Sequence, residues 1–357
     1  MRGAMHSPMV YSHTDLIRFA HDVLSAAGLN SGKASVVAET LVEADLMGHT
    51  THGLHLLPAY AKEVAEGKMR RDGEPSVISD RGSVVVWDGN YLPGPWLVNR
   101  AMDLLMDRIA AHPVGTLVIR RSHHIACLAA YPERIARAGC LMLLSSSDPR
   151  VKSVAPFGGL DAVYTPNPIA GGIPTDGDPI IFDISMSTTS NAFVLRTRDE
   201  GKKLPHPWLL TPEGQVTDDP NAFVTDPPAT ILPLGGMDTG YKGFALGILV
   251  EALTSGLAGY GRADNPNQWG ASVFLQIMDP RAFGGGEAFD RQMKFFIDAC
   301  LASRPLGNPV RMPGTRAFQL REKQKRDGVS LYPTIPPALK ACGDAYGVLF
   351  PEPLASR

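Results

Sequence analysis

The sequence predicts an α/β fold with a helical N-terminal part, on three observations. The first 70 residues carry apolar side chains at helical spacing. Further along, short aliphatic runs bounded by turn residues are separated by an amphipathic helical pattern, as is typical of buried strands and of helices that pack on a sheet. The 30 prolines and 36 glycines are spread along the chain and indicate frequent turns.

The helical start is predicted in detail by its start and stop signals. Thr14 can cap a first helix that Gly28 ends, and a second helix begins near Ser31 and continues until Gly48 breaks it. The segment from Gly48 to Gly53 is therefore expected as a turn held by a rigid helix, a good place for a catalytic side chain.

The later elements are expected from shorter patterns. The expected strands are 84–87, 117–119, 141–144 and 180–182, and an amphipathic helix is expected over 95–111. The segment 243–257 is almost continuously apolar, so a helix buried on all sides is expected there. The segment 202–226 is rich in Pro, Asp and Thr and is expected as a long surface excursion.

Composition excludes several classes of partner. The chain has 34 basic and 36 acidic residues, so no global charge favours nucleic acid or an anionic membrane, and a small molecule is the expected partner. No apolar run of about 18 residues occurs, and the N-terminus lacks the apolar region of a secretory signal. A cytoplasmic protein is expected. The four cysteines form no C-x-x-C pair, which argues against a zinc knuckle or a thioredoxin-like motif.

The chain lacks the usual glycine signatures of nucleotide binding. No G-x-G-x-x-G follows a strand, and no G-x-x-x-x-G-K-[ST] occurs. These patterns alone therefore indicate an α/β protein of enzyme size and nothing more specific.

Seven segments, in order over about residues 40–320, resemble the malate/L-lactate dehydrogenase-like family. The first, Ala44-Asp-Leu-Met-Gly-His-Thr-Thr-His-Gly53 followed by Pro58 and Tyr60, is similar to the family pattern A-D-x-x-G-x-x-S-H-G-x-x-R with a later Tyr. The others are Ser122-His-His-Ile-Ala126, Val154-Ala-Pro-Phe-Gly-Gly159, Asn167-Pro-Ile-Ala170, Phe182-Asp-Ile-Ser185, Leu232-Pro-Leu-Gly-Gly236 with Gly240-Tyr-Lys-Gly243, and Met312-Pro-Gly314.

The resemblance implies a fold and a cofactor. The family, which includes malate, sulfolactate and ureidoglycolate dehydrogenases, diketogulonate reductase and cyclic imino-acid reductases, has a non-Rossmann NAD(P)-binding fold, and this accounts for the missing glycine signature. NADPH or NADH and a homodimer are implied. We expect a discontinuous helical, substrate-side domain of residues 10–120 plus 290–357 and an NAD(P)-binding domain of residues 121–289.

The resemblance also assigns the chemistry. His52 stands at the family's proton-donor position, and an imidazole can supply a proton because its ordinary pKa lies near neutral pH. Thr51 keeps the hydroxyl of the family's Ser. The remaining expected contacts are to the cofactor, with the cations suited to its phosphates; they are His124, Ile125, Ala126, Cys127, Leu128, Asp183, Ile184, Ser185, Lys242, Arg311, Pro313 and Arg316.

The chain departs from the family in the expected substrate pocket. Leu56 replaces the Arg that grips a 2-oxo acid carboxylate, and Asn191 and Phe193 stand where the family has A-R-G followed by Lys or Asp. His123 replaces an Asn, and Pro166 a Thr. Losing a charge-assisted bond typically forfeits about 1.5–3 kcal/mol. An efficient malate dehydrogenase is therefore not expected.

Three explanations fit these departures. The substrate is less polar, with Leu56 and Phe193 forming an apolar wall; another cation such as Arg120, Arg121 or Arg198 takes over; or catalysis is lost or redirected. The first is favoured and predicts a specialised reductase of a ketone or cyclic imine.

Two alternatives belong to other functional classes. A metal hydrolase would use His49, His52 and His55, but glycines break this segment and no carboxylate stands at a zincin position. A non-redox lyase, isomerase or pseudoenzyme on the same fold would account for the lost charges.

Overall fold

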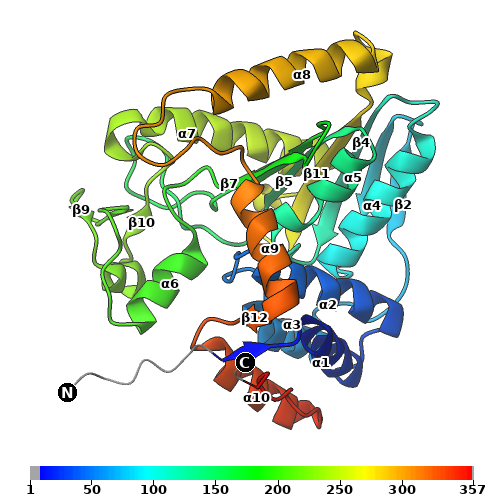
Figure 1. Cartoon of the computed structure of the whole chain (residues 1–357). Helices are drawn as coiled ribbons and strands as arrows, with labels where there is room; N and C mark the ends of the chain where they lie inside the picture. Colours follow the sequence, from blue (N-terminus) through cyan, green and yellow to red (C-terminus); the bar gives the residue numbers. More distant parts are fainter. Residues whose placement is uncertain (1–8, 356–357) are drawn as a thin grey trace.

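The computed structural model describes residues 9–355. At its centre is a seven-stranded mixed sheet with helices against both faces, and a layer of helices lies across one end of the sheet (Figure 1). Two smaller sheets, of two and three strands, lie outside it. Within the described range, no helix is long and apolar enough to cross a membrane.

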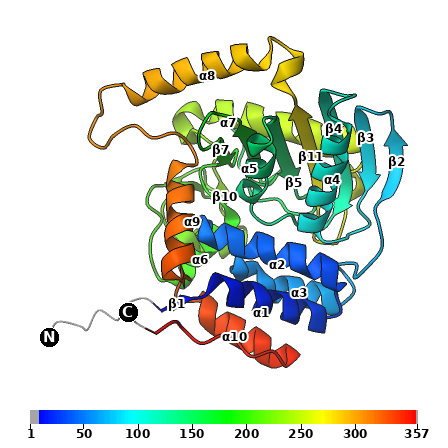
Figure 2. The ribbon, with the colours of Figure 1, turned by 45° about the vertical axis from the view of Figure 1, so that its right-hand side comes forward.

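The helical layer is formed by elements from the N-terminal and C-terminal regions of the described chain. The apolar face of α1 and the length of α2 pack together, and the pairing of β1 with β12 fastens the N-terminal segment beside the C-terminal one (Figure 2). Ser12, not Thr14, caps α1, because its hydroxyl accepts from the backbone of Asp15. The two expected helices are confirmed. The layer comprises β1 (Val10–Tyr11), α1 (His13–Ala26), α2 (Ser31–Leu46), α3 (Leu57–Ala65), β12 (Val329–Ser330) and α10 (Ile335–Tyr346).

The central sheet has the order β2-β3-β4-β11-β5-β6-β7. Only β3 and β4 run parallel in this sheet. They are connected by α4 (Gly94–Arg108), the helix that the amphipathic pattern of 95–111 predicted. The four expected strands are confirmed. The strands are β2 (Ser76–Asp80), β3 (Val84–Asp88), β4 (Val114–Ser122), β5 (Leu141–Ser147), β6 (Ile169–Ile173), β7 (Ile180–Ile184) and β11 (Ala271–Met278).

Alternation along the central strands divides the core into two faces. On β4 and β11, Leu117 and Leu275 pack in the cluster that includes α4 and α5 (Pro132–Arg137). Val118 and Phe274 point the other way, toward the π-helical segment Ala252–Gly256 that follows α7 (Gly236–Glu251). Both faces of the sheet centre are therefore covered, which explains the continuous apolar runs.

The expectation of a helix buried on all sides over 243–257 is wrong. The helix exists, as α7 and its π-helical extension, but Leu246, Ile248, Leu249 and Leu257 are each about half exposed. An apolar pattern indicates that burial of a helix surface is favourable. It does not specify that the same chain buries it.

The remaining elements complete two outer regions. The expected excursion 202–226 contains a small sheet rather than only loop, and it packs beside α6. The outer elements are α6 (Asn191–Asp199), β8 (Leu209–Leu210), β9 (Val216–Thr217), β10 (Thr230–Ile231), α8 (Gly286–Leu301), α9 (Thr315–Asp327) and the short 3-10 turns at Leu54–Leu56, Leu128–Ala130, Pro220–Val224, Arg262–Asp264 and Pro280–Ala282.

The central sheet runs across the expected domain boundary at residue 120. Strands β2, β3 and β4 belong to the same sheet as β5, β6, β7 and β11, and the boundary falls inside β4. The division into domains of residues 10–120 plus 290–357 and 121–289 therefore stays a prediction. The central sheet contains strands from both of these expected domains.

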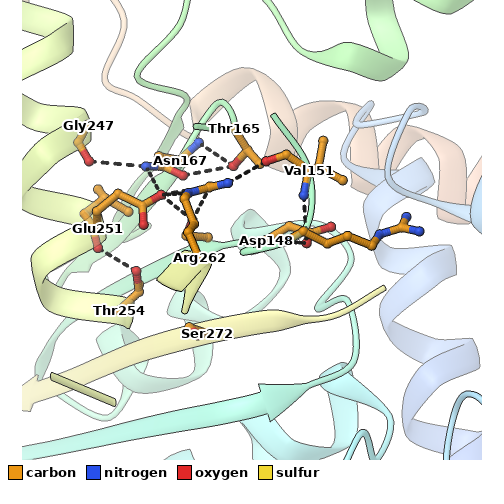
Figure 3. A network of polar contacts seen from close by, with 12 residues as sticks. Asp148, Val151, Thr165, Asn167, Gly247, Glu251, Thr254, Arg262 and Ser272 are labelled. Atoms are coloured by element: carbon orange, nitrogen blue, oxygen red, sulfur yellow. Dashed lines mark hydrogen bonds and ion pairs between the residues drawn. The ribbon is translucent and has the colours of Figure 1, made fainter. Parts of the chain in front are cut away.

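A buried polar network joins α7 to the end of β5 (Figure 3). Glu251 Oε1 accepts from Ser147 Oγ at 2.7 Å, from Asn167 Nδ2 at 3.0 Å and from Arg262 Nη2 at 2.9 Å. Arg262 also donates to the carbonyl of Val151 at 2.6 Å. Because Glu251 Oε1 accepts from three side chains, the network fixes the end of β5 beside a cavity that Ser146 and Asp148 line.

Candidate active site

The turn after α2 is held by a buried carboxyl group. Asp45 Oδ2 accepts from the backbone N–H of Leu54 at 2.7 Å, and burial raises the pKa of Asp45 to about 7. Gly53 lies so close that a Cβ there would stand 2.4 Å from Asp45 Oδ2. The His-Gly pair therefore has a steric reason, since any side chain at position 53 would displace the turn that carries His52.

His52 projects from this turn into a cavity. Its Nδ1 lies 2.9 Å from Thr51 Oγ1, and its ring stacks on that of His124 with centroids 5.9 Å apart. Desolvation lowers the pKa of His52 to about 4, with further contributions from the charges of His49, His55 and Arg196. The imidazole is therefore neutral at pH 7 in the ligand-free protein.

His124 is fixed from two sides at the end of β4. Tyr60 OH lies 2.7 Å from His124 Nδ1 and donates to the His124 carbonyl at 3.1 Å, while the Trp269 ring packs 5.0 Å from the imidazole. Gly94 allows this approach, because a Cβ there would stand 2.4 Å from the His124 carbonyl oxygen. Burial holds the pKa of His124 well below its usual value.

Most of the expected site residues line one cavity of about 790 Å³. They come from the turn after α2, the segment after β4, the end of β7 and the start of α6. The structure brings together His52, Thr51, Leu56, His124, Ile125, Ala126, Cys127, Leu128, Asp183, Ser185 and Asn191.

A second cavity of about 680 Å³ adjoins the first, because His49 and Asp183 line both. Arg311 and Arg316 stand on its wall beside Gly314, the residue from which α9 begins. Two cations and a helix N-terminus are a donor set that suits phosphate groups. The expected residues Ile184, Asp183, Arg311, Pro313 and Arg316 meet here.

Two expected site residues lie in neither cavity. Lys242 is exposed on α7, with its Nζ 5.8 Å from the Tyr241 ring centroid. Phe193 packs instead in the small cluster under α6, 6.2 Å from the Trp208 ring. One side of a helix presents Asn191 to the cavity while Phe193, two residues on, faces the small cluster.

The cations proposed to replace the family's Arg are largely committed elsewhere. Arg120 and Arg121 both pair with the buried Asp88 and line neither cavity. Arg198 does line the larger cavity, but it pairs with Asp199 at 2.6 Å. Sequence reasoning missed Arg196 and Trp269, which also line this cavity. The signal available for Arg196 was a second cation two residues before Arg198 in the sequence.

The three histidines of the hydrolase alternative do not converge on one point. Among the described residues, the group with metal-ligand spacing is His49, Cys127 and Asp183, whose ligand atoms lie within 4.8 Å of one another. His52 and His55 are outside it. Cys127 Sγ already donates to Asp183 Oδ2 at 3.8 Å, and the Asp183 carboxylate also accepts from Ala129 N at 3.0 Å.

Comparisons with known proteins identify the family. Residues 11–340 match the family model described as malate/L-lactate dehydrogenase. An L-lactate dehydrogenase of Cupriavidus necator is 31% identical over 279 residues, covering 76% of this chain and 79% of that protein. A Delta(1)-pyrroline-2-carboxylate reductase of Ancylobacter novellus is 28% identical over 95% of this chain and 99% of that protein.

The fold agrees with solved structures. The crystal structure of malate dehydrogenase from Entamoeba histolytica superposes with a TM-score of 0.90 at 23% identity, covering 97% of this chain and all of that one. The chain belongs to the malate/L-lactate dehydrogenase family, and it is an oxidoreductase. The non-Rossmann α/β fold expected from the resemblance is confirmed.

Proposed function

We propose that this protein is an NADH- or NADPH-dependent reductase or dehydrogenase of a small ketone, 2-hydroxy acid or cyclic imine, with His52 as the group that exchanges the proton. The observation that carries this proposal is the placement of His52 in a cavity that continues directly into a second one walled by arginines. Relatives named for lactate oxidation and for pyrroline-2-carboxylate reduction support the same chemistry.

The second cavity is the proposed cofactor groove. Arg311, Arg316 and the N-terminus of α9 would hold the phosphates, and the segment after His124 would hold the nicotinamide end. When bound, the reduced nicotinamide supplies a hydride. The two cavities share the wall formed by His49 and Asp183, so one extended ligand could occupy both.

His52 balances the hydride step with a proton. In reduction, the substrate carbon accepts the hydride, the π electrons of its C=O or C=N bond move to oxygen or nitrogen, and His52 gives that atom a proton. In oxidation, the neutral imidazole takes the hydroxyl proton. With a pKa of about 4 in the ligand-free protein, His52 is ready as a base at neutral pH and must gain a proton before acting as a donor. Thr51, 2.9 Å away, orients the ring.

The proposed substrate pocket is less charged than the family pattern. Leu56 contributes an apolar wall where a guanidinium is expected, and Asn191 is neutral where the family has a cation.

Nucleotide titration and one variant test the proposal. NADH and NADPH are titrated while nicotinamide fluorescence is followed, and at least one should bind. His52→Ala should then abolish turnover and leave dinucleotide affinity within about twofold, because the imidazole serves proton transfer and the phosphates bind elsewhere. His206→Ala, at an exposed ring, is the control. Failure of both nucleotides to bind would end the redox proposal, and retained turnover would remove His52 from its role.

We also propose a homodimer formed through α7 and α8. None of the α8 side chains is buried, and the apolar side chains of Phe295 and Phe296 are 74% and 61% exposed. The apolar side chains of α7 are also exposed to solvent. Both views show α8 standing off the sheet on the side of α7 (Figures 1 and 2). A second copy would remove these surfaces from water.

A further inference from the structure

Arg196 is a cation held rigidly at the wall of the catalytic cavity. It lies on α6, and its two terminal nitrogens donate to Thr50 Oγ1 and to the Thr50 carbonyl, each at 2.8 Å. The Tyr332 ring lies 4.4 Å from Arg196 Cζ and covers the guanidinium. Thr50 is two residues from His52, so the guanidinium is attached to the catalytic turn itself.

No carboxylate of the described chain neutralises Arg196 within 4.0 Å. The carboxylates on its own helix are engaged: Asp199 pairs with Arg198, and Glu200 accepts from Tyr332 OH and pairs with Lys202 at 2.6 Å. Asp45 accepts from the Leu54 backbone N–H. Burial lowers the pKa of Arg196, and the charges of Glu200 and Asp45 act to raise it, although neither carboxylate forms an ion pair with Arg196. A half-buried guanidinium without an ion-pair partner keeps hydrogen-bonding capacity and positive charge for a ligand.

The donor geometry suits a small anion. Thr50 uses one N–H of each terminal nitrogen, and among the described residues Arg196 Nε has no hydrogen-bond partner. The charge also acts on the reacting group, since Arg196 contributes to the lowered pKa of both His52 and His55. An anion bound at Arg196 would offset that contribution and favour the protonated imidazole that reduction requires.

We propose that Arg196 binds the carboxylate of the substrate, so that this chain has moved the carboxylate grip from position 56 to helix α6. The inference rests on the proposed function and narrows it to a 2-oxo acid or a cyclic imine carboxylate. Leu56 then forms an apolar wall for the rest of the substrate. Arg196 then supplies the positive charge that the family pattern has at position 56, from a helix that is distant in the sequence and lines the same cavity.

Matched substrates separate this role from a merely structural one. Pyruvate is compared with methyl pyruvate, and Δ1-pyrroline-2-carboxylate with its methyl ester, so that each pair differs in the charge of the carboxyl group and in one methyl group. Arg196→Gln should raise KM for the acids about 10- to 100-fold, as the loss of a charge-assisted bond implies. KM and kcat for the esters should change less than threefold. Arg196→Lys, which keeps the charge and loses the fork, should give an intermediate KM.

Binding without turnover gives a second readout. The wild-type protein with NADH or NADPH present is titrated with oxamate by calorimetry, and Arg196→Gln should weaken oxamate binding by a similar factor. Arg198→Gln, on the same helix and facing the same cavity but paired with Asp199, is the control and should shift oxamate affinity less than threefold.

Three results would overturn the inference. If Arg196→Gln lowers kcat equally for acids and esters with oxamate binding unchanged, Arg196 only supports the Thr50 turn. If Arg198→Gln causes the selective loss, the grip lies there. If the wild-type protein binds no oxamate or favours the esters, the pocket takes an uncharged substrate. Absence of nucleotide binding would instead refute the proposed redox function, and oxamate binding that depends on Arg196 would still stand.

Discussion

At the scale of single residues, the protonation state of His52 determines whether it can act in its proposed role as proton donor or as base. Desolvation and neighbouring positive charge place its pKa at about 4, well below the ordinary value of 6.5. A lowered pKa means that the proton is lost as pH rises through about 4, so only a small and shrinking fraction carries the proton between pH 5 and 8.

The pH dependence of reduction follows from this value. We expect kcat/KM for reduction to fall about tenfold per pH unit between pH 5.5 and 8, since this parameter reports the protonated fraction of the free enzyme. In the oxidation direction, kcat/KM should be nearly constant over the same range. Initial rates in a constant-ionic-strength buffer series measure both. A plateau of the reduction profile below pH 7 would show that the donor has an ordinary pKa.

At the scale of elements, α9 is fixed to two other helices by one arginine. Arg321, which is 9% exposed, donates to Glu43 of α2 at 2.7 Å and to Glu133 of α5 at 2.9 Å. Because α9 begins beside Arg311 and Arg316, these bonds also position the proposed cofactor groove.

Removing this cation should destabilise the protein and the groove together. We expect Arg321→Met to lower the free energy of unfolding by about 3 kcal/mol, because it leaves two partly buried carboxylates short of a partner. Nucleotide affinity should fall as well. Urea unfolding and fluorescence titration measure the two effects. Arg326→Met is the control, since the Arg326 side chain is 70% exposed and forms an ion pair with its neighbour Asp327 on the surface. Equal stabilities of the two variants would contradict this account of α9.

At the scale of the whole molecule, α7 and α8 expose an apolar surface that no other part of the described chain buries. Leu246, Ile248, Leu249, Phe295 and Phe296 are all exposed on these two helices. Such a concentration of exposed apolar side chains is unusual for a protein that acts as a monomer.

Charged substitutions on α8 should separate the proposed dimer. Phe295→Asp combined with Phe296→Asp should change the sedimentation mass from that of two chains to that of one, because the carboxylates would lose hydration in the interface. Leu349→Asp, at a side chain 90% exposed near the C-terminal end, should leave the mass unchanged. A wild-type protein that sediments as a single chain at tens of micromolar would rule out this dimer.

Local chemistry accounts for what was predictable in the fold. The signals Ser31 and Gly48 predicted α2, and the aliphatic runs predicted four strands of the central sheet, because capping and side-chain alternation act within a few residues. The strand order and the sheet that crosses residue 120 depend on contacts between distant segments. The exposure of α7 likewise depends on what covers it, which a hydrophobic pattern does not specify.

For the candidate site, the sequence by itself determined the family, the turn that carries His52 and the absence of a guanidinium at Leu56. Those features reside in contiguous residues, and the steric need for Gly53 beside Asp45 explains one of them. Only the tertiary structure decided which cations face His52. Arg120 and Arg121 form ion pairs with Asp88. Phe193 packs in a different cluster. Arg196 lines the cavity and is hydrogen-bonded to Thr50. Side-chain direction and ion pairing are set by packing between elements, and so they appear only when the chain is folded.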